Sequence, residues 1–186
     1  GAGKSTVLKT LFGLLKPRQG RILLDGQSVA GATPKELLAK GIAFVPQGRN
    51  LFGQLSVYQN LELGGITLGM KTTHERIPEV LEFFPRVKER LHSMASSLSG
   101  GEQKRLVLEA LLRGPEDVLI LDEPDNYLDV PVKRWLEERL VTSPKTVLFI
   151  SHDRELLSRV ATRIATLEPN PAGASIWVHP GSFTTY

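Results

Sequence analysis

The sequence contains no cysteine among its 186 residues. Disulfide bonds and thiolate metal sites are therefore excluded, because both require cysteine sulfur. A chain without disulfides fits a reducing compartment, and we expect it in the cytoplasm.

Long apolar runs are also missing. No stretch approaches the ~18 consecutive apolar residues that suggest a membrane-spanning helix, and the first residues do not resemble a signal peptide. We therefore expect any membrane role to work through a partner. The net charge of +3 is spread along the chain. Charge alone thus does not indicate nucleic-acid binding, although a surface that touches ribosomal RNA stays open.

What is present is the composition of an ordinary globular domain, with 41% hydrophobic and 23% charged residues. In the first part, apolar spacing predicts a helix over residues 4–15, and residues 20–26 predict a short strand closed by an Asp-Gly turn. Residues 33–36 form a capping box that starts another helix. Residues 42–45 predict an apolar strand that delivers Gln47.

Residues 53–102 have a different character. Residues 56–59 resemble a second capping box, and residues 74–84 suit a helix with Pro78 placed early. We expect this stretch to be a small, mainly helical subdomain.

Two apolar runs, residues 118–121 and 147–150, predict buried strands separated by a helix over about 132–140. Such an order is typical of a parallel sheet flanked by helices, which gives an α/β fold. Asp122-Glu123 and Ser151-His152 follow these strands, at the sheet edge where such folds bind ligands. The tail, residues 163–168 and 176–179, predicts a terminal hairpin.

The chain starts with Gly1-Ala2-Gly3-Lys4-Ser5-Thr6, which reads as the second half of a phosphate-binding loop. Backbone N–H groups of such a loop and the following helix N-terminus bind phosphate oxygens. Lys4 should reach the β and γ phosphates, and Ser5 should ligate Mg²⁺. The full pattern places its first glycine five residues before Gly3, so we expect the loop to be cut in half here.

Asp122, after four apolar residues, has the arrangement in which a buried strand aims a carboxylate at the magnesium shell. Glu123 would then take a proton from an attacking water. The alternative is an ordinary exposed turn.

The string Leu98-Ser99-Gly100-Gly101-Glu102-Gln103 is the most specific one present. Read locally, Ser99 is an N-cap of a helix from Glu102. A capped helix start is itself suited to binding an anion.

Taken in order, these strings resemble the ATP-binding cassette (ABC) ATPases over essentially the whole chain. The resemblance implies a P-loop NTPase fold, MgATP as the ligand, and a single nucleotide-binding domain over residues 1–186 that lacks its N-terminal strands. It implies that Ser99, Gly100 and Gly101 contact ATP held by a second cassette, so that dimerisation completes the site.

The same resemblance assigns further roles. Gln47 matches the family's Q-loop, which senses magnesium and the attacking water, and His152 matches the switch histidine of the γ-phosphate. Leu128-Asp129 matches a loop that contacts the second cassette. Surface or packing roles are expected for the other histidines, His74, His92 and His179, and for the two tryptophans, Trp135 and Trp177.

Two branches of the family are represented. Residues 1–103 resemble the ATP-binding subunits of branched-chain amino-acid importers, through strings such as residues 45–52 and 84–90. Residues 98–186 resemble the F subfamily, which acts on the ribosome, through residues 122–129 and 179–186. We therefore describe the chain as a mosaic with a join near residues 98–103, the string that matches the family's signature.

Three functions remain open. The first is a transport ATPase at the inner face of the membrane, coupled to integral membrane subunits and transporting, for example, branched-chain amino acids. The second is a ribosome-associated translation or antibiotic-resistance factor. The third is a truncated cassette that hydrolyses nothing.

Overall fold

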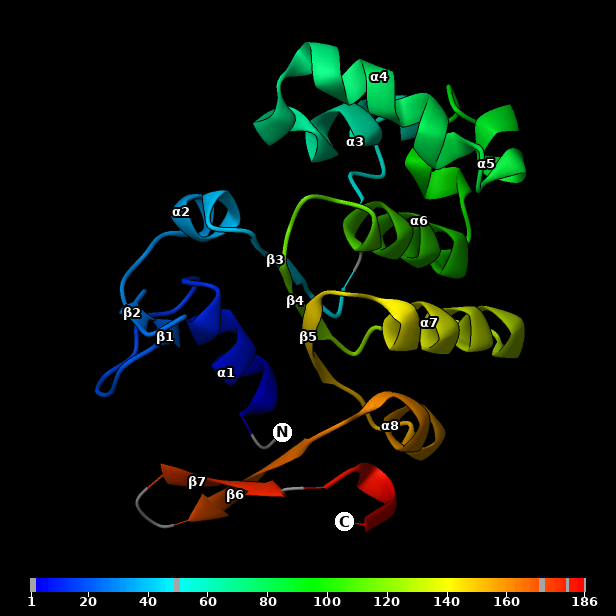
Figure 1. The fold of residues 1–186 in the computed structure, drawn as a ribbon. Helices are drawn as coiled ribbons and strands as arrows, with labels where there is room; N and C mark the ends of the chain where they lie inside the picture. The colour runs from blue at the N-terminus through cyan, green and yellow to red at the C-terminus, as the bar shows by residue number, and fades with distance from the viewer. Residues whose placement is uncertain (1–2, 49–50, 171–172, 180, 186) are drawn as a thin grey trace. The chain divides into compact units, whose positions relative to one another are not determined.

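The computed structural model describes residues 3–48, 51–170, 173–179 and 181–185. The chain divides into two compact units. The sheet unit comprises Gly1–Gln47, Pro115–Asn126 and Lys133–Tyr186, and the helical unit comprises Gly48–Gly114 and Tyr127–Val132. Figure 1 labels their elements.

Three parallel strands in the order β3-β4-β5 form the central sheet of the sheet unit (Figure 1). They are β3 (Ile42–Val45), β4 (Val118–Asp122) and β5 (Thr146–Ile150). Val45 pairs with Leu121, and Asp122 pairs with Ile150, so the strands end level with one another. The predicted parallel α/β sheet is confirmed, and the loops after all three strands lie at one edge.

Burial differs between these strands. Leu119 and Leu121 of β4 are fully buried, as expected for a central strand. No residue of β5 is fully buried, and Leu148 is 41% exposed. Among the described strands β5 pairs only with β4, so one of its edges has no strand beside it, which explains the difference.

Helix α1 (Lys4–Leu11) is shorter than the predicted helix over residues 4–15. It ends before Gly13, which adopts a φ of +73°, and a Cβ there would lie 2.2 Å from the carbonyl oxygen of Ala32. The predicted strand over residues 20–26 is a hairpin of β1 (Leu23–Leu24) and β2 (Gln27–Ser28).

The predicted capping box at Thr33 is present and starts α2 (Pro34–Ala39). A core shared by these elements and the sheet includes Leu8, Leu37 and Ile120. This core holds α1 in the sheet unit.

The helical unit is built from short helices. They are α3 (Val57–Gly64), η1 (Ile66–Leu68), α4 (Met70–Leu81), α5 (Pro85–Glu89), η2 (Ala95–Ser97) and α6 (Gly100–Leu112). Their core contains Val57, Ala95 and Leu106, all at most 1% exposed.

The prediction for Pro78 was wrong. Helix α4 begins at Met70, so Pro78 lies in the helix interior rather than near its start. The missing N–H of proline normally disfavours this position. Thr73, Ile77 and Leu81 are buried on one face of α4, and this packing maintains the helix.

The last part of the sheet unit contains α7 (Val130–Thr142), which starts in the helical unit, followed by α8 (Arg154–Val160) and η3 (Phe183–Thr185). The predicted terminal hairpin is confirmed as β6 (Ile164–Asn170) antiparallel to β7 (Gly173–His179).

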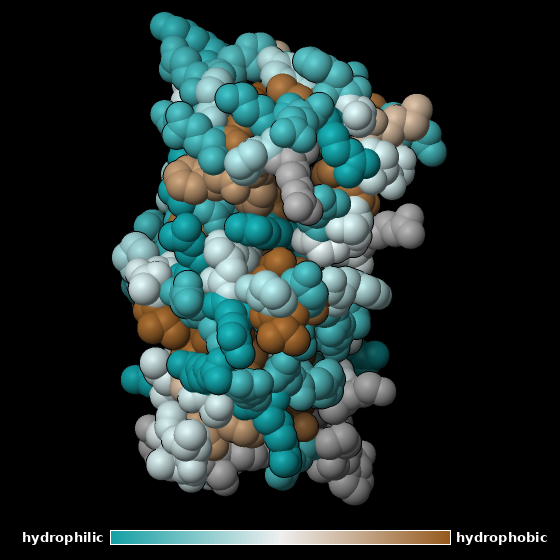
Figure 2. All heavy atoms as spheres, turned by 90° about the vertical axis from the view of Figure 1, so that its right-hand side faces the viewer, coloured by the Kyte–Doolittle hydropathy of each residue, from teal (hydrophilic) through white to brown (hydrophobic). Residues whose placement is uncertain are grey.

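Within the described ranges, no helix has both the length and the apolar character needed to cross a bilayer. The face drawn in Figure 2 is mainly hydrophilic, with apolar side chains in small separate patches.

Candidate nucleotide site

The N-terminus of α1 lies at the start of the site. Its N-cap residue is Gly3, with a φ of +76°, and no side chain caps the helix. The first backbone N–H groups of a helix have no partner within the helix, and the helix dipole favours an anion there. Lys4 and Ser5 are half-buried, whereas Gly3 and Thr6 are exposed. The predicted residues Gly1 and Ala2 lie outside the described residues.

Ser5 and Asp122 are brought together from positions 117 residues apart. The Ser5 hydroxyl donates to Asp122 Oδ1 at 3.0 Å, and Asp122 is only 2% exposed at the end of β4. A hydroxyl and a carboxylate are the hard oxygen ligands that suit Mg²⁺.

These two oxygens do not form a complete metal cage. The part of the chain that the structure describes holds no group of three or more His, Asp or Glu side chains suited to a metal. Mg²⁺ commonly takes one or two protein ligands together with waters and substrate phosphates. The residues present therefore fit a Mg²⁺ ion that arrives with a phosphate ligand.

Glu123 lies in a strained backbone conformation beside this pair. Its φ is +50°, a left-handed value that is costly for a non-glycine residue. Its N–H donates to the carbonyl of Ile150 at 3.0 Å, which fixes this turn to the end of β5.

The Glu123 carboxylate faces the other two residues that were predicted to act in catalysis, Gln47 and His152. Gln47 Nε2 donates to Glu123 Oε2 at 2.6 Å, and His152 Nε2 lies 3.6 Å from Glu123 Oε1. The Glu123 side chain is 16% exposed, whereas that of His152 is 71% exposed. Gln47 was predicted to act in catalysis and on the metal, and its amide here contacts Glu123.

The sequence reasoning missed Asn126. Its Nδ2 donates to Glu123 Oε2, the same oxygen that Gln47 contacts. Its place three residues after Glu123 was the available signal, because a tight turn brings such residues together. Backbone geometry supports this, since the Asn126 N–H donates to the Glu123 carbonyl at 3.3 Å.

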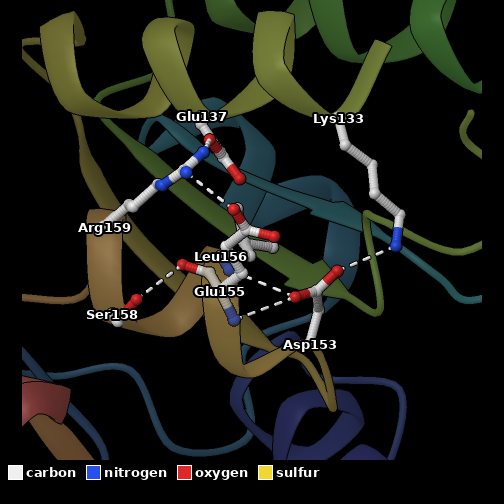
Figure 3. Close-up of polar contacts among 7 residues, drawn as sticks. All are labelled: Lys133, Glu137, Asp153, Glu155, Leu156, Ser158 and Arg159. Carbon is white, nitrogen blue, oxygen red and sulfur yellow. Dashed lines mark hydrogen bonds and ion pairs between the residues drawn. The ribbon is translucent and has the colours of Figure 1, made fainter. Parts of the chain in front are cut away.

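Asp153, the residue after His152, was not assigned a role either. Its Oδ1 accepts from the N–H groups of Glu155 and Leu156, and its Oδ2 accepts from Lys133 Nζ at 2.8 Å (Figure 3). The Lys133 ammonium holds the pKa of Asp153 below its ordinary value, and Asp153 in turn raises the pKa of Lys133.

Ser99, Gly100 and Gly101 belong to the helical unit. Ser99 caps α6: its Oγ accepts from the Glu102 N–H at 3.2 Å, and Glu102 Oε2 accepts from the Ser99 N–H at 2.8 Å. The predicted N-cap is thus confirmed, and the Ser99 side chain is exposed. Its contact with a nucleotide of a second cassette stays a prediction.

The loop before α7 also belongs to the helical unit. Leu128 is buried, and Asp129 Oδ1 accepts from the Val132 N–H at 3.0 Å, which caps α7. A Cβ at Gly101 would lie 3.2 Å from the Tyr127 carbonyl oxygen, so glycine allows this loop to approach the start of α6.

The remaining histidines make local contacts. His74 pairs with Glu62 at 2.7 Å, the His92 ring lies 6.0 Å from Tyr58, and the His179 ring lies 5.4 Å from that of Trp177.

Comparison with known proteins decides the family. A sequence profile described as ABC transporter matches residues 1–126. The chain belongs to the ABC transporter family of ATPases. This ABC cassette is 34% identical to BraG, the high-affinity branched-chain amino acid transport ATP-binding protein of Pseudomonas aeruginosa, over 97% of its own length and 81% of BraG.

A second relative matches differently. An antibiotic resistance protein of Mycobacteroides abscessus is 76% identical to the cassette over 91 residues, which cover 49% of this chain. The matched segment spans only 16% of that protein.

Among solved structures, a dimeric ATP-binding cassette in a post-hydrolysis state with ADP and Pi has a TM-score of 0.70 and 25% sequence identity. The match covers 88% of this chain and 75% of that one. The expected P-loop NTPase fold is confirmed.

Proposed function

We propose that this cassette binds and hydrolyses MgATP at an interface between two cassettes. One observation carries the proposal: the ends of α1, β3, β4 and β5 gather Ser5, Asp122, Glu123, Gln47 and His152 at one edge of the sheet. A polar set of this composition at the carboxyl edge of a parallel sheet suits phosphoryl transfer to water.

The residues divide the work by their chemistry. Lys4 and the backbone N–H groups at the start of α1 would hold the phosphates, with Thr6 and the preceding glycines beside them. Ser5 and Asp122 would hold Mg²⁺, and Gln47 would reach the same ion. Bound Mg²⁺ would neutralise charge on the phosphate oxygens.

Glu123 is the proposed general base. Its carboxylate would accept a proton from the attacking water, while Gln47 orients that water and His152 donates to the γ-phosphate. The Gln47 and Asn126 contacts support this role, because they fix the carboxylate before the substrate arrives.

The second cassette would supply Ser99, Gly100 and Gly101. The start of α6 presents an exposed hydroxyl and helix N–H groups, which suits the γ-phosphate of a nucleotide on the partner. The dimeric state of the ADP-bound neighbour supports this arrangement.

We propose that hydrolysis powers transport through integral membrane subunits at the inner face of the cell membrane, with branched-chain amino acids as the cargo. The match to BraG, which covers 97% of this chain and 81% of BraG, supports this. The second candidate, an antibiotic-resistance factor acting on the ribosome, is supported by the 76% identity over 91 residues and by the F-subfamily strings after the signature.

The first experiment measures ATP binding and turnover by the purified chain. We expect MgATP to raise the unfolding temperature, because a ligand that binds the folded state stabilises it. Lys4→Ala should remove most of this shift, whereas Lys9→Ala, an exposed position on the same helix, should retain it.

A chain that binds ATP without turnover would leave the third reading, a non-hydrolysing cassette. Copurification with an integral membrane protein would favour transport, and cosedimentation with ribosomes would favour the second candidate.

A further inference from the structure

The loop that carries His152 is attached to α7 by one ion pair. Lys133 Nζ contacts Asp153 Oδ2 at 2.8 Å, with the two side chains 34% and 23% exposed (Figure 3). Asp153 is held on its other side as well, because its Oδ1 caps α8 and its N–H donates to Ser151 Oγ at 2.9 Å. The residue next to His152 is therefore fixed at three atoms.

His152 itself is held less firmly. Its side chain is 71% exposed, and Glu123 Oε1 lies 3.6 Å away, beyond a good hydrogen-bond distance. The place of the imidazole thus depends mainly on the backbone at residues 151–153, which Asp153 fixes.

Lys133 also lies within electrostatic range of the loop that carries Glu123. Asp125 is 6% exposed, and its Oδ1 has no hydrogen-bond partner within the described ranges. Its negative charge contributes to the raised pKa of Lys133, after the larger effect of Asp153.

We propose that Lys133 is a positioning residue, which holds the loop of His152 against α7 through Asp153. It touches neither phosphate nor water in this role. The proposal rests on the proposed function, since the place of the His152 imidazole affects turnover only if this side chain acts on the phosphate.

The test compares Lys133→Met, Lys133→Arg and Asp153→Asn with a matched control, Arg159→Met. Asn retains the N-cap of α8 but turns the Lys133 acceptor into an amide that does not carry charge. Arg159 joins the same two helices through Glu137 at 2.7 Å and also contacts Glu155 at 2.6 Å (Figure 3).

For Lys133→Met and Asp153→Asn we expect kcat to fall about tenfold with KM for ATP almost unchanged, a size typical of residues that act through a neighbour. Lys133→Arg should retain most of the rate, because a single N–O contact does not require the lysine shape. The double variant Lys133→Met with Asp153→Asn should be no slower than either single variant, since each single change already removes the same ion pair. Arg159→Met should lower the unfolding temperature without lowering kcat.

A second readout does not need turnover. The chain has four histidines, so the imidazole NMR signals of His152 can be assigned with His152→Gln. Lys133→Met should shift these signals, and Arg159→Met should not. An inactive wild type whose His152 signals still respond to Lys133→Met would overturn the proposed function and leave the geometric link standing. An active wild type whose kcat and His152 signals ignore Lys133→Met would overturn the role of Lys133.

Discussion

The N-termini of α1 and α6 are both proposed to contact phosphate, but they are capped differently. Helix α1 starts at Gly3 with no side-chain cap. Helix α6 starts at Ser99, whose hydroxyl and backbone are paired reciprocally with Glu102. The free N–H groups of a helix start need a partner in either case. In α6 the Ser99 side chain supplies a partner for one of these groups, whereas in α1 a bound ligand would supply the partners.

This difference indicates which end depends on nucleotide. The start of α6 is preformed, and its serine can accept from Glu102 while its own hydroxyl proton remains available for a phosphate oxygen. The start of α1 has its neighbouring Ser5 hydroxyl engaged with Asp122 instead. We therefore expect nucleotide to stabilise the surroundings of α1 more than those of α6.

The largest effect should come from Glu123→Gln, in the site formed with the uncapped start of α1. Loss of the general base should lower ATP hydrolysis about 10²- to 10⁴-fold while ATP binding persists. Glu102→Gln at the capped start of α6 is the matched control, because glutamine also completes a capping box. Turnover and nucleotide affinity are measured for both. Equal losses in the two variants would show that the carboxylates do not differ in role.

Ser5→Ala should have the next largest effect. It removes the donor to buried Asp122, which should cost about 1–3 kcal/mol of unfolding free energy. It should also remove the extra thermal stabilisation that ATP gains from Mg²⁺, measured with and without a chelator. An unchanged magnesium effect would contradict the role of Ser5 as a ligand.

A smaller effect distinguishes the structural role of Ser99, as the cap of α6, from its proposed contact with ATP. Ser99→Ala and Ser56→Ala each remove a serine N-cap with a complete capping box, on α6 and α3. Each should cost about 1 kcal/mol in urea unfolding. Only Ser99→Ala should also slow hydrolysis by the dimer, because only this serine is proposed to reach ATP. If both variants slow turnover alike, Ser99 acts as a cap alone.

Sequence patterns predicted the elements where local signals agree. The boxes at Thr33 and Ser56 gave the correct starts of α2 and α3, because a cap is decided by residues three apart. The N-cap at Ser99 was also predicted, but its helix was expected from Glu102, whereas α6 begins at Gly100. The parallel arrangement of β4 and β5 followed from their apolar runs and the helix between them, whereas the place of β3 beside β4 was not predicted. Ser5 and Asp122 were both expected at one magnesium ion, and the structure places them 3.0 Å apart.

The errors arose where tertiary packing outweighed local preference. Pro78 lies inside α4 because the buried face of that helix offsets the missing hydrogen bond. Helix α1 stops early because Gly13 approaches the carbonyl of Ala32, a contact that no local pattern encodes. Asn126 and Lys133 were missed for a related reason: each contacts a residue of the site only after the loops have folded.

The smallest predicted effect concerns α8, whose N-terminus is closed by a charged side chain. The pKa of Asp153 is lowered chiefly by Lys133, so its contribution to stability is present above its ordinary value of about 3.9 and is lost as pH falls through the lowered value. The pKa of Lys133 is raised, so its contribution is present below about 10.4 and is lost as pH rises through the raised value.

The stability gap between wild type and Asp153→Asn should therefore be flat between about pH 5 and 9, at about 0.5–1 kcal/mol for this partly exposed pair. It should shrink in acid, because a protonated aspartate resembles asparagine. Urea midpoints measured from pH 7 down to the lowest pH at which wild type stays folded test this. A gap that persists unchanged in acid would mean that the charge of Asp153 adds nothing to its cap, and α8 would then resemble α6, where closure does not need an ion pair.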